Sequence, residues 1–300
     1  MLLTLEDETL RDGLQNESRI FSLDEKVRIF RQLVDSGIKR IQVGSFVHPR
    51  LVPQMANTDE LVRVLTNVPE DVVLTALVLN AKGLERAQKC GLAHLSMSVS
   101  ASDSHSRKNV GRPAKTALAE MTALIREARE TGLSVRAGIQ CAFGCVYEGE
   151  ISEDTVLATA EYLAASGASE INLADTTGMA GPRQIRSLLR RIQGEFPEIT
   201  ISLHLHNTRG LGLVNTLAAY EEGIRLFDVC VGGLGGCPFV DGAGGNVPTE
   251  DAVHMFEAAG VPTGVDLQRI CRLSELLEEM LARPLAGHMS RVLRKMQKIC

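Results

Sequence analysis

Two histidines separated by one residue, His204 and His206, stand at the end of an apolar run that extends from Ile199 to Leu205. The run has the composition of a buried strand, and successive side chains of a strand point to opposite faces. Both imidazoles are therefore expected on one face, where they could bind a single cation. Two histidines that line a polar groove without a metal are the alternative, which the pair alone leaves open.

Residues capable of chemistry also occur near both ends of the chain. The stretch from Glu8 to Glu17 is dense in charged and amide side chains, including Arg11 and Asp12, at a point where a helix should begin. A glycine-rich segment later in the sequence contains Cys237 and Asn246. A carboxylate, two imidazoles and an amide oxygen suit Mg²⁺, Mn²⁺ or a similar divalent ion better than structural zinc.

These residues must be brought together by the fold, and the order of the predicted elements indicates how. Eight short apolar runs alternate with amphipathic segments, and glycines such as Gly37 and Gly91 follow the helical runs, where they end helices. The predicted strands are Leu2–Leu5, Arg40–Val43, Val72–Val78, His94–Val99, Ser134–Ile139, Glu170–Leu173, Thr200–Leu205 and Phe227–Val231. This alternation predicts an α/β fold, a (β/α)₈ TIM barrel. A doubly wound sheet is less consistent because no glycine-rich phosphate turn follows Leu5.

The barrel prediction places the chemistry-bearing residues on one rim. We predict a catalytic barrel over residues 1–266 and a short helical C-terminal extension, residues 267–300, packed on the barrel. Active sites of such barrels lie at the carboxyl ends of the strands. The first and eighth strands are neighbours in a closed barrel, and the seventh adjoins the eighth. Side chains that can converge there are Asp12, His204, His206 and Asn246.

The overall composition excludes several classes of protein. The chain has 300 residues, 44% of them hydrophobic, and a net charge of −5, which argues against a nucleic-acid partner. No apolar stretch approaches the ~20 residues needed to span a membrane, and the N-terminus lacks the pattern of a signal peptide. An odd number of cysteines, seven, indicates reduced thiols and a cytoplasmic protein.

Each candidate residue also has an ordinary structural interpretation. Asp12 could be a helix N-cap, with Arg11 as its surface partner. The glycines around Cys237 could serve only to form a tight loop, with the cysteine as a small buried side chain. The joint placement of these residues on one rim favours a shared site.

Several longer motifs resemble the 3-hydroxy-3-methylglutaryl-CoA (HMG-CoA) lyase family, and the likeness extends over nearly the whole chain. The motifs are Arg11 to Glu17, Ser45-Phe46-Val47, Val52 to Met55, Cys141 to Gly149, Ala174-Asp175-Thr176 and Gly235 to Phe239. The resemblance implies cleavage of HMG-CoA to acetoacetate and acetyl-CoA, a step of leucine catabolism, by a homodimer that requires a divalent metal. A related lyase for another 3-hydroxyacyl-CoA, an aldolase or condensing synthase, and a non-catalytic barrel are the alternatives.

The resemblance also assigns expected roles to individual residues. It makes Asp12, His204, His206 and Asn246 the ligands of Mg²⁺ or Mn²⁺. It makes Arg11 the stabiliser of the thioester enolate and Cys237 a mobile-loop residue needed for turnover, while His204 or Asp175 would serve the proton transfers. The segment that matches the family's basic rim, and could bind coenzyme A, contains Arg107, Lys108 and Asn109. Ordinary solvated charge is the alternative for that segment.

The sequence departs from the family pattern in four segments near the expected site. Gln42 replaces a glutamate, Asn207-Thr208-Arg209 replaces an Asp-Thr-Tyr sequence, Ile139 replaces a tyrosine and Ser18 replaces a lysine. We hypothesise that the altered charge admits a substrate with an extra or relocated carboxylate, or with a different acyl branch, contacted by Gln15, Gln42 and Arg209. An Arg209→Tyr variant with unchanged preference among 3-hydroxyacyl-CoA substrates would contradict this. The alternative is that Arg209 points to solvent.

Overall fold

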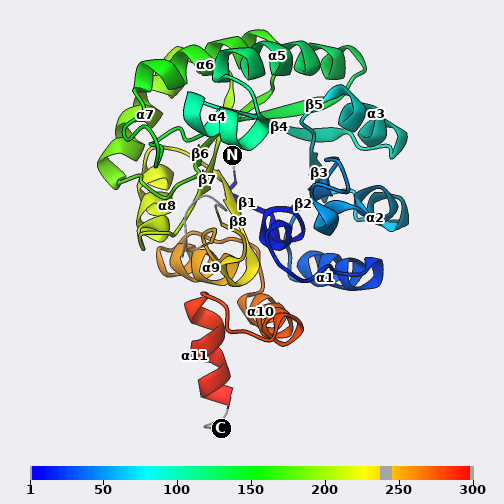
Figure 1. Ribbon diagram of the computed structural model, residues 1–300. Coiled ribbons are helices and arrows are strands. Elements are labelled where there is room, and N and C mark those ends of the chain that lie inside the picture. Colours follow the sequence, from blue (N-terminus) through cyan, green and yellow to red (C-terminus); the bar gives the residue numbers. More distant parts are fainter. Residues whose placement is uncertain (1, 237–244, 298–300) are drawn as a thin grey trace.

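Eight parallel strands form a closed barrel in the computed structural model, which describes residues 2–236 and 245–297. The strands pair in chain order and β1 pairs with β8, so the predicted (β/α)₈ TIM barrel is confirmed. Figure 1 shows the strands at the centre with the helices around them. The strands are β1 (Thr4–Asp7), β2 (Arg40–Ser45), β3 (Val73–Leu77), β4 (His94–Ser100), β5 (Ser134–Gln140), β6 (Glu170–Asp175), β7 (Thr200–Leu205) and β8 (Leu226–Val229).

Helices follow the strands on the outside of the barrel. They are α1 (Leu23–Asp35), α2 (Thr58–Val64), α3 (Ala81–Lys89), α4 (Asp103–Val110), α5 (Ala114–Glu130), α6 (Glu153–Ala165), α7 (Pro182–Glu195), α8 (Gly212–Glu221), α9 (Thr249–Ala258), α10 (Leu267–Leu281) and α11 (His288–Gln297). Three shorter turns are η1 (Thr9–Gly13), η2 (Pro53–Met55) and η3 (Val231–Gly233). Helix α10 packs against α1 and α9, and α11 extends farthest from the barrel. The predicted division of the chain at residue 266 stays a prediction.

Local sequence determines where α1 begins. The Ser22 hydroxyl accepts a hydrogen bond from the Glu25 backbone N–H at 3.2 Å, and the Glu25 carboxylate accepts one from the Ser22 N–H at 2.8 Å. This capping box satisfies two of the helix's free N–H groups and is worth about 1 kcal/mol. Helix α1 therefore starts where the apolar periodicity of the sequence starts.

Side chains of the strands face two different environments. Fully buried Ile41, Val43 and Leu203 belong to the apolar core. Alternate positions point into the barrel, and several of them are charged. Arg136 of β5 contacts Glu6 of β1 at 2.6 Å across the barrel, which only inward-facing side chains can do. The barrel interior is therefore a polar layer enclosed by an apolar one.

Strand β1 begins and ends later than the sequence predicts. The predicted strand, Leu2–Leu5, omits Glu6 and Asp7, and two consecutive acidic residues are unusual in a buried strand. Both are fully buried. Glu6 accepts a hydrogen bond from Thr75 at 2.6 Å and pairs with Arg40 at 2.5 Å, contacts that offset part of its desolvation.

No helix in residues 2–236 or 245–297 combines the length and the apolar character that a membrane crossing requires.

The interior charges make the fold sensitive to the loss of Arg136. Its guanidinium is buried and contacts Glu6, Glu8, Glu170 and Asp228. We expect Arg136→Met to lower the free energy of unfolding by about 3–5 kcal/mol, because it leaves buried carboxylates without their cation. Urea denaturation measures the change.

An exposed arginine provides the control for this measurement. Arg190 forms an exposed ion pair with Glu222 at 2.7 Å, so Arg190→Met should leave the free energy of unfolding nearly unchanged. Equal effects of the two substitutions would contradict a central role of Arg136 in neutralising the interior.

Candidate metal centre and active site

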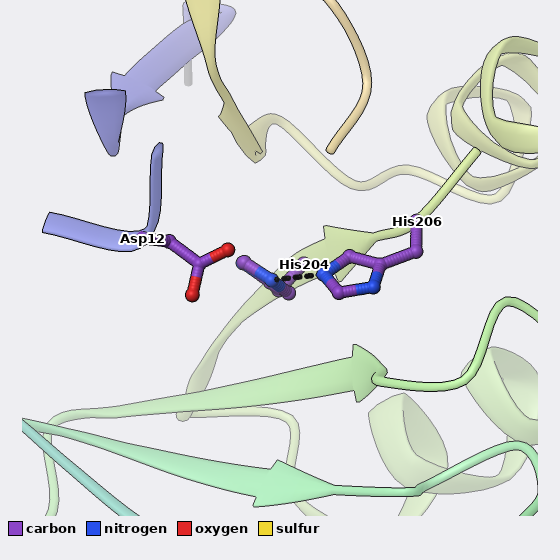
Figure 2. A group of neighbouring side chains, drawn as sticks. All are labelled: Asp12, His204 and His206. Atoms are coloured by element: carbon purple, nitrogen blue, oxygen red, sulfur yellow. Dashed lines mark hydrogen bonds between the residues drawn. The ribbon is translucent and has the colours of Figure 1, made fainter. Parts of the chain in front are cut away.

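Three side chains from distant parts of the chain meet at the carboxyl end of the barrel. Asp12, His204 and His206 each place one potential ligand atom within 4.8 Å of the others. Figure 2 shows the three side chains. The Nε2 atoms of the two histidines are 3.0 Å apart. Two nitrogens that bind one cation at about 2.1 Å, at right angles to each other, lie about 3.0 Å apart. The spacing therefore fits two imidazoles that share a metal ion.

Asn246 lies at the same place. A β-bridge joins it to His206, and its Nδ2 donates hydrogen bonds to Asp12 Oδ2 at 2.7 Å and to the Leu234 carbonyl at 3.0 Å. Its Oδ1 is buried and has no hydrogen-bond partner among the described residues, an arrangement that costs about 1–3 kcal/mol. A divalent cation would satisfy this oxygen. The four predicted ligands therefore come together and fit a divalent ion.

Asp12 is positioned by the turn η1 and is not a helix N-cap. Asp12 lies inside this π-helical turn and its Oδ1 accepts a hydrogen bond from Arg11 Nη1 at 2.5 Å. A Cβ at Gly235 would lie 2.6 Å from both Asp12 Oδ2 and Asn246 Nδ2. Gly235 also has φ = +89°, so its lack of a side chain lets the loop after β8 approach the site.

Acidic neighbours control the charge of His204. Burial alone would lower its pKa, but Glu8, Asp228 and Asp12 raise it to about 9. Asp228 Oδ2 lies 3.1 Å from His204 Nδ1, the arrangement in which a carboxylate orients a metal-binding histidine. Because a metal takes neutral imidazole, binding at His204 should release a proton.

His206 has the opposite charge preference. Burial and the positive charge of His204 lower the pKa of His206 to about 4, so its ring is neutral near pH 7. A neutral ring is the form that binds a metal.

Arg11 presents an unused donor beside these ligands. Its Nη1 contacts Asp12 and lies 3.6 Å from Glu8 Oε2, whereas its Nε is buried without a hydrogen-bond partner in the described part of the chain. Arg11 also lines the cavity at this end of the barrel. It could therefore donate to an anionic group of a ligand.

The cavity has a volume of about 990 Å³ and extends from the two histidines to α4 and α5. Its wall includes Gln15, Gln42 and Asn109, each predicted to contact a ligand, together with Arg112 and Leu124 of the outer part. This size suits an elongated ligand with one end beside Asp12.

Other predicted residues are not among those that line the cavity. Arg209 Nη1 donates to the carbonyls of Thr177 and Gly178 at 2.7 and 2.8 Å, so its charge stabilises the loop after β6. Asp175 accepts hydrogen bonds from the backbone N–H groups of Met179 and Ala180, and burial raises its pKa to about 6. Both therefore hold a loop that borders the site.

The three residues of the predicted basic rim segment differ in position, and some of them do not line the cavity. Arg107 pairs with Asp103 at 2.6 Å within α4, a helix that the sequence analysis did not predict although Ser102 caps it. Lys108 lies over the Tyr147 ring at 4.4 Å, and only Asn109 of the three lines the cavity. Cys237 lies outside the described residues.

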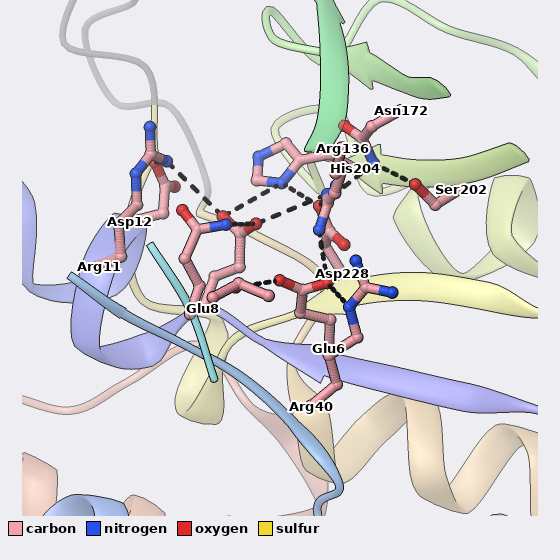
Figure 3. Close-up of polar contacts among 12 residues, drawn as sticks. Glu6, Glu8, Arg11, Asp12, Arg40, Arg136, Asn172, Ser202, His204 and Asp228 are labelled. Carbon is pink, nitrogen blue, oxygen red and sulfur yellow. Dashed lines mark hydrogen bonds and ion pairs between the residues drawn. The ribbon is translucent and has the colours of Figure 1, made fainter. Parts of the chain in front are cut away.

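Sequence reasoning missed Glu8, Arg136 and Asp228, which surround His204 in Figure 3. All three line the cavity floor and are buried. A detectable signal exists: Arg136 and Asp228 each interrupt an apolar strand, where a charge is costly unless another group pairs with it. The identity of those partners is not visible in the sequence.

Comparison with known proteins agrees with this geometry. Residues 3–277 match the family model described as HMGL-like. The chain belongs to the HMGL-like family. It is 42% identical to the (R)-citramalyl-CoA lyase of Chloroflexus aurantiacus over 94% of this chain and 92% of that protein. Its relatives in this family are named lyases, and this chain is a lyase.

Solved structures of HMGL-like proteins have the same fold. The HMG-CoA lyase of Bacillus subtilis superposes with a TM-score of 0.93 at 34% identity, covering 98% of both chains. An HMG-CoA lyase from Acinetobacter baumannii, in complex with coenzyme A and 3-methylmalate, superposes with a TM-score of 0.91 at 37% identity, covering 97% of this chain and 94% of that one.

We expect the purified HMGL-like lyase to bind one Mn²⁺ per chain at this site. His206→Ala should weaken binding by at least about 100-fold, because it removes a neutral imidazole that is already placed for coordination. Electron paramagnetic resonance of free Mn²⁺ measures the affinity. His254→Ala, which changes an exposed histidine, is the control. Unchanged Mn²⁺ affinity in His206→Ala would contradict the assignment.

Proposed function

We propose that this chain is a divalent-metal-dependent lyase that cleaves a 3-hydroxyacyl-CoA thioester by a retro-Claisen step and releases acetyl-CoA. The observation that carries the proposal is the meeting of Asp12, His204 and His206 at one end of a cavity that also exposes Arg11. The named relatives support the thioester, since they act on citramalyl-CoA or HMG-CoA according to their names. Coenzyme A bound to a relative supports the same partner.

The proposed metal site has four protein ligands. Asp12, His204, His206 and Asn246 would hold Mg²⁺ or Mn²⁺, and the bound ion would lower the pKa of the substrate hydroxyl next to it. The mixture of oxygen and imidazole ligands fits either metal.

The bond-breaking step moves an electron pair of the hydroxyl oxygen into the new carbonyl and the pair of the carbon–carbon bond into the thioester. The hydroxyl loses its proton, its oxygen forms the new carbonyl, and the bond between C2 and C3 of the acyl chain breaks. The electron pair of that bond passes to the thioester as an enolate, which takes a proton to become acetyl-CoA. Arg11 would donate to the enolate oxygen, since its Nε is buried without a partner in the described structure. Cys237 stays the predicted proton donor, and His204 or Asp175 a predicted participant in proton transfer.

Two thioesters of one chemical class are candidate substrates, and they differ in the acyl group. Both citramalyl-CoA and HMG-CoA carry a tertiary 3-hydroxyl, a methyl group and one free carboxylate in addition to the thioester. In citramalyl-CoA this carboxylate is attached directly to the hydroxyl-bearing carbon, and cleavage yields pyruvate. In HMG-CoA a methylene separates them, and cleavage yields acetoacetate. We favour citramalyl-CoA because the match to the named citramalyl-CoA lyase has 42% identity, against 35% for the HMG-CoA lyase of Bacillus subtilis.

The proposed partner is therefore a small acyl-CoA. The expected homodimer and cytoplasmic location stay predictions. The condensing direction of the same chemistry is the second possibility within this family.

A direct assay tests the proposed reaction. We expect purified protein with Mg²⁺ or Mn²⁺ to release acetyl-CoA from (R)-citramalyl-CoA, at a higher kcat/KM than from HMG-CoA, and to lose activity after EDTA treatment. Liquid chromatography of the coenzyme A products measures both substrates. Activity that survives metal removal, or no release from either thioester, would contradict the proposal.

Arg11 provides a second test of the mechanism. Arg11→Met should lower kcat by about 10²–10³-fold, because it removes a donor that acts on charge developing in the transition state. Arg190→Met is the control, since Arg190 is exposed and does not line the cavity in the described residues. If Arg11→Met raised KM and left kcat unchanged, Arg11 would act in substrate binding and not in the bond-breaking step.

A further inference from the structure

Glu8, the residue directly after β1, lies among the charged groups of the active site without a role in the reaction proposed above. It is buried, with 3% of its surface exposed, and it lines the cavity. The groups that face it come from five other positions: Gln42, Arg11, His204, Arg136 and the carboxylate of Asp228.

The two oxygens of Glu8 contact different partners. Oε1 accepts a hydrogen bond from Gln42 Nε2 at 2.9 Å and lies 3.7 Å from Arg136 Nη2. Oε2 lies 3.6 Å from Arg11 Nη1 and 3.6 Å from His204 Nδ1. Glu8 therefore stands between the arginine proposed to stabilise the enolate and a proposed metal ligand.

Arg11 needs an anion other than Asp12. Asp12 Oδ1 accepts a hydrogen bond from Arg11, and Asp12 is also a proposed ligand of the metal. A cation draws electron density from the carboxylate that binds it and repels the guanidinium beside it. Glu8 is the second carboxylate within 4 Å of Arg11 in the described structure. It can keep the guanidinium in place once Asp12 binds a metal.

Gln42 makes this arrangement electrostatically possible. A carboxylate at position 42 would stand about 2.9 Å from the Glu8 carboxylate, and two like charges at that distance oppose each other. The amide instead donates a hydrogen bond and fixes the orientation of Glu8. The pair therefore consists of one acid, Glu8, directly after β1, and one amide, Gln42, in the adjacent strand β2.

We propose that Glu8, oriented by Gln42, is a positioning residue that holds Arg11 against the reacting thioester. This inference rests on the proposed lyase function. Glu8 touches neither substrate nor metal in this role, so its removal should affect kcat and leave the binding of Mn²⁺ intact.

The test compares Glu8→Gln with a charge-exchanged double variant. Glu8→Gln should lower kcat on the better of the two thioesters by about 10²-fold, as expected for a misplaced catalytic group, with KM and Mn²⁺ affinity within about 3-fold of wild type. Glu8→Gln with Gln42→Glu again has one acid and one amide in the pair. Its kcat should be at least about 10-fold higher than the kcat of Glu8→Gln.

A buried carboxylate of the same interior provides the matched control. Glu170 contacts Arg40 and Arg136 but does not line the cavity in the described residues. Glu170→Gln should retain kcat within about 3-fold even where it lowers stability, because it has no contact with Arg11. Circular dichroism verifies folding, and Glu8→Asp replaces Glu8→Gln in the assay if the latter does not fold.

Four results would overturn the inference. Full kcat in Glu8→Gln would show that Arg11 does not need Glu8. A folded double variant with no recovery would contradict the acid–amide pairing. Loss of Mn²⁺ affinity by more than about 10-fold would make Glu8 a metal ligand. Wild-type protein inactive on both thioesters would instead remove the proposed function, and this inference with it.

Discussion

The pairing of β1 with β8 is the interaction on which the site depends. These strands run parallel in the register Thr4 to Leu226 and Glu6 to Asp228, and they close the barrel. The closure places the turn that follows β1 beside the loop that follows β8. Asp12 and Asn246 are 234 residues apart in the chain, yet they share a 2.7 Å hydrogen bond because of it. An open sheet would leave the proposed ligands at its two edges.

Charge balance inside the barrel is the second constraint. Arg136 stands among Glu6, Glu8, Glu170 and Asp228, and Arg40 pairs with two of these carboxylates. Apolar side chains would fill the barrel at a lower desolvation cost. The charged interior instead places Asp228 and Glu8 around His204, which sets the charge and orientation of that ring. The interior is thus organised for the chemistry at its carboxyl end as well as for stability.

The loops of the rim perform two separate tasks. Those after β1, β7 and β8, together with His204 of β7 itself, supply the side chains that converge on one point. The loop after β6 is held by Asp175 and Arg209 through backbone hydrogen bonds. A charged residue near an active site therefore need not contact the ligand. Its hydrogen bonds to main-chain groups can shape the cavity while its charge remains outside it.

The sequence by itself determined the fold and the proposed metal ligands. Strand and helix periodicities are local properties, so the eight-fold alternation, the common face of His204 and His206, and the rim position of Asp12 could be predicted. Only the tertiary structure decided that Glu8 and Asp228 meet at His204, and that Arg209 contacts carbonyls of a neighbouring loop. Contacts across a barrel depend on strand register and closure, which leave no periodic pattern in the sequence. For the same reason the acidic end of β1 lies beyond the predicted strand: the partners of Glu6, which are Thr75, Arg40 and Arg136, lie on three other strands.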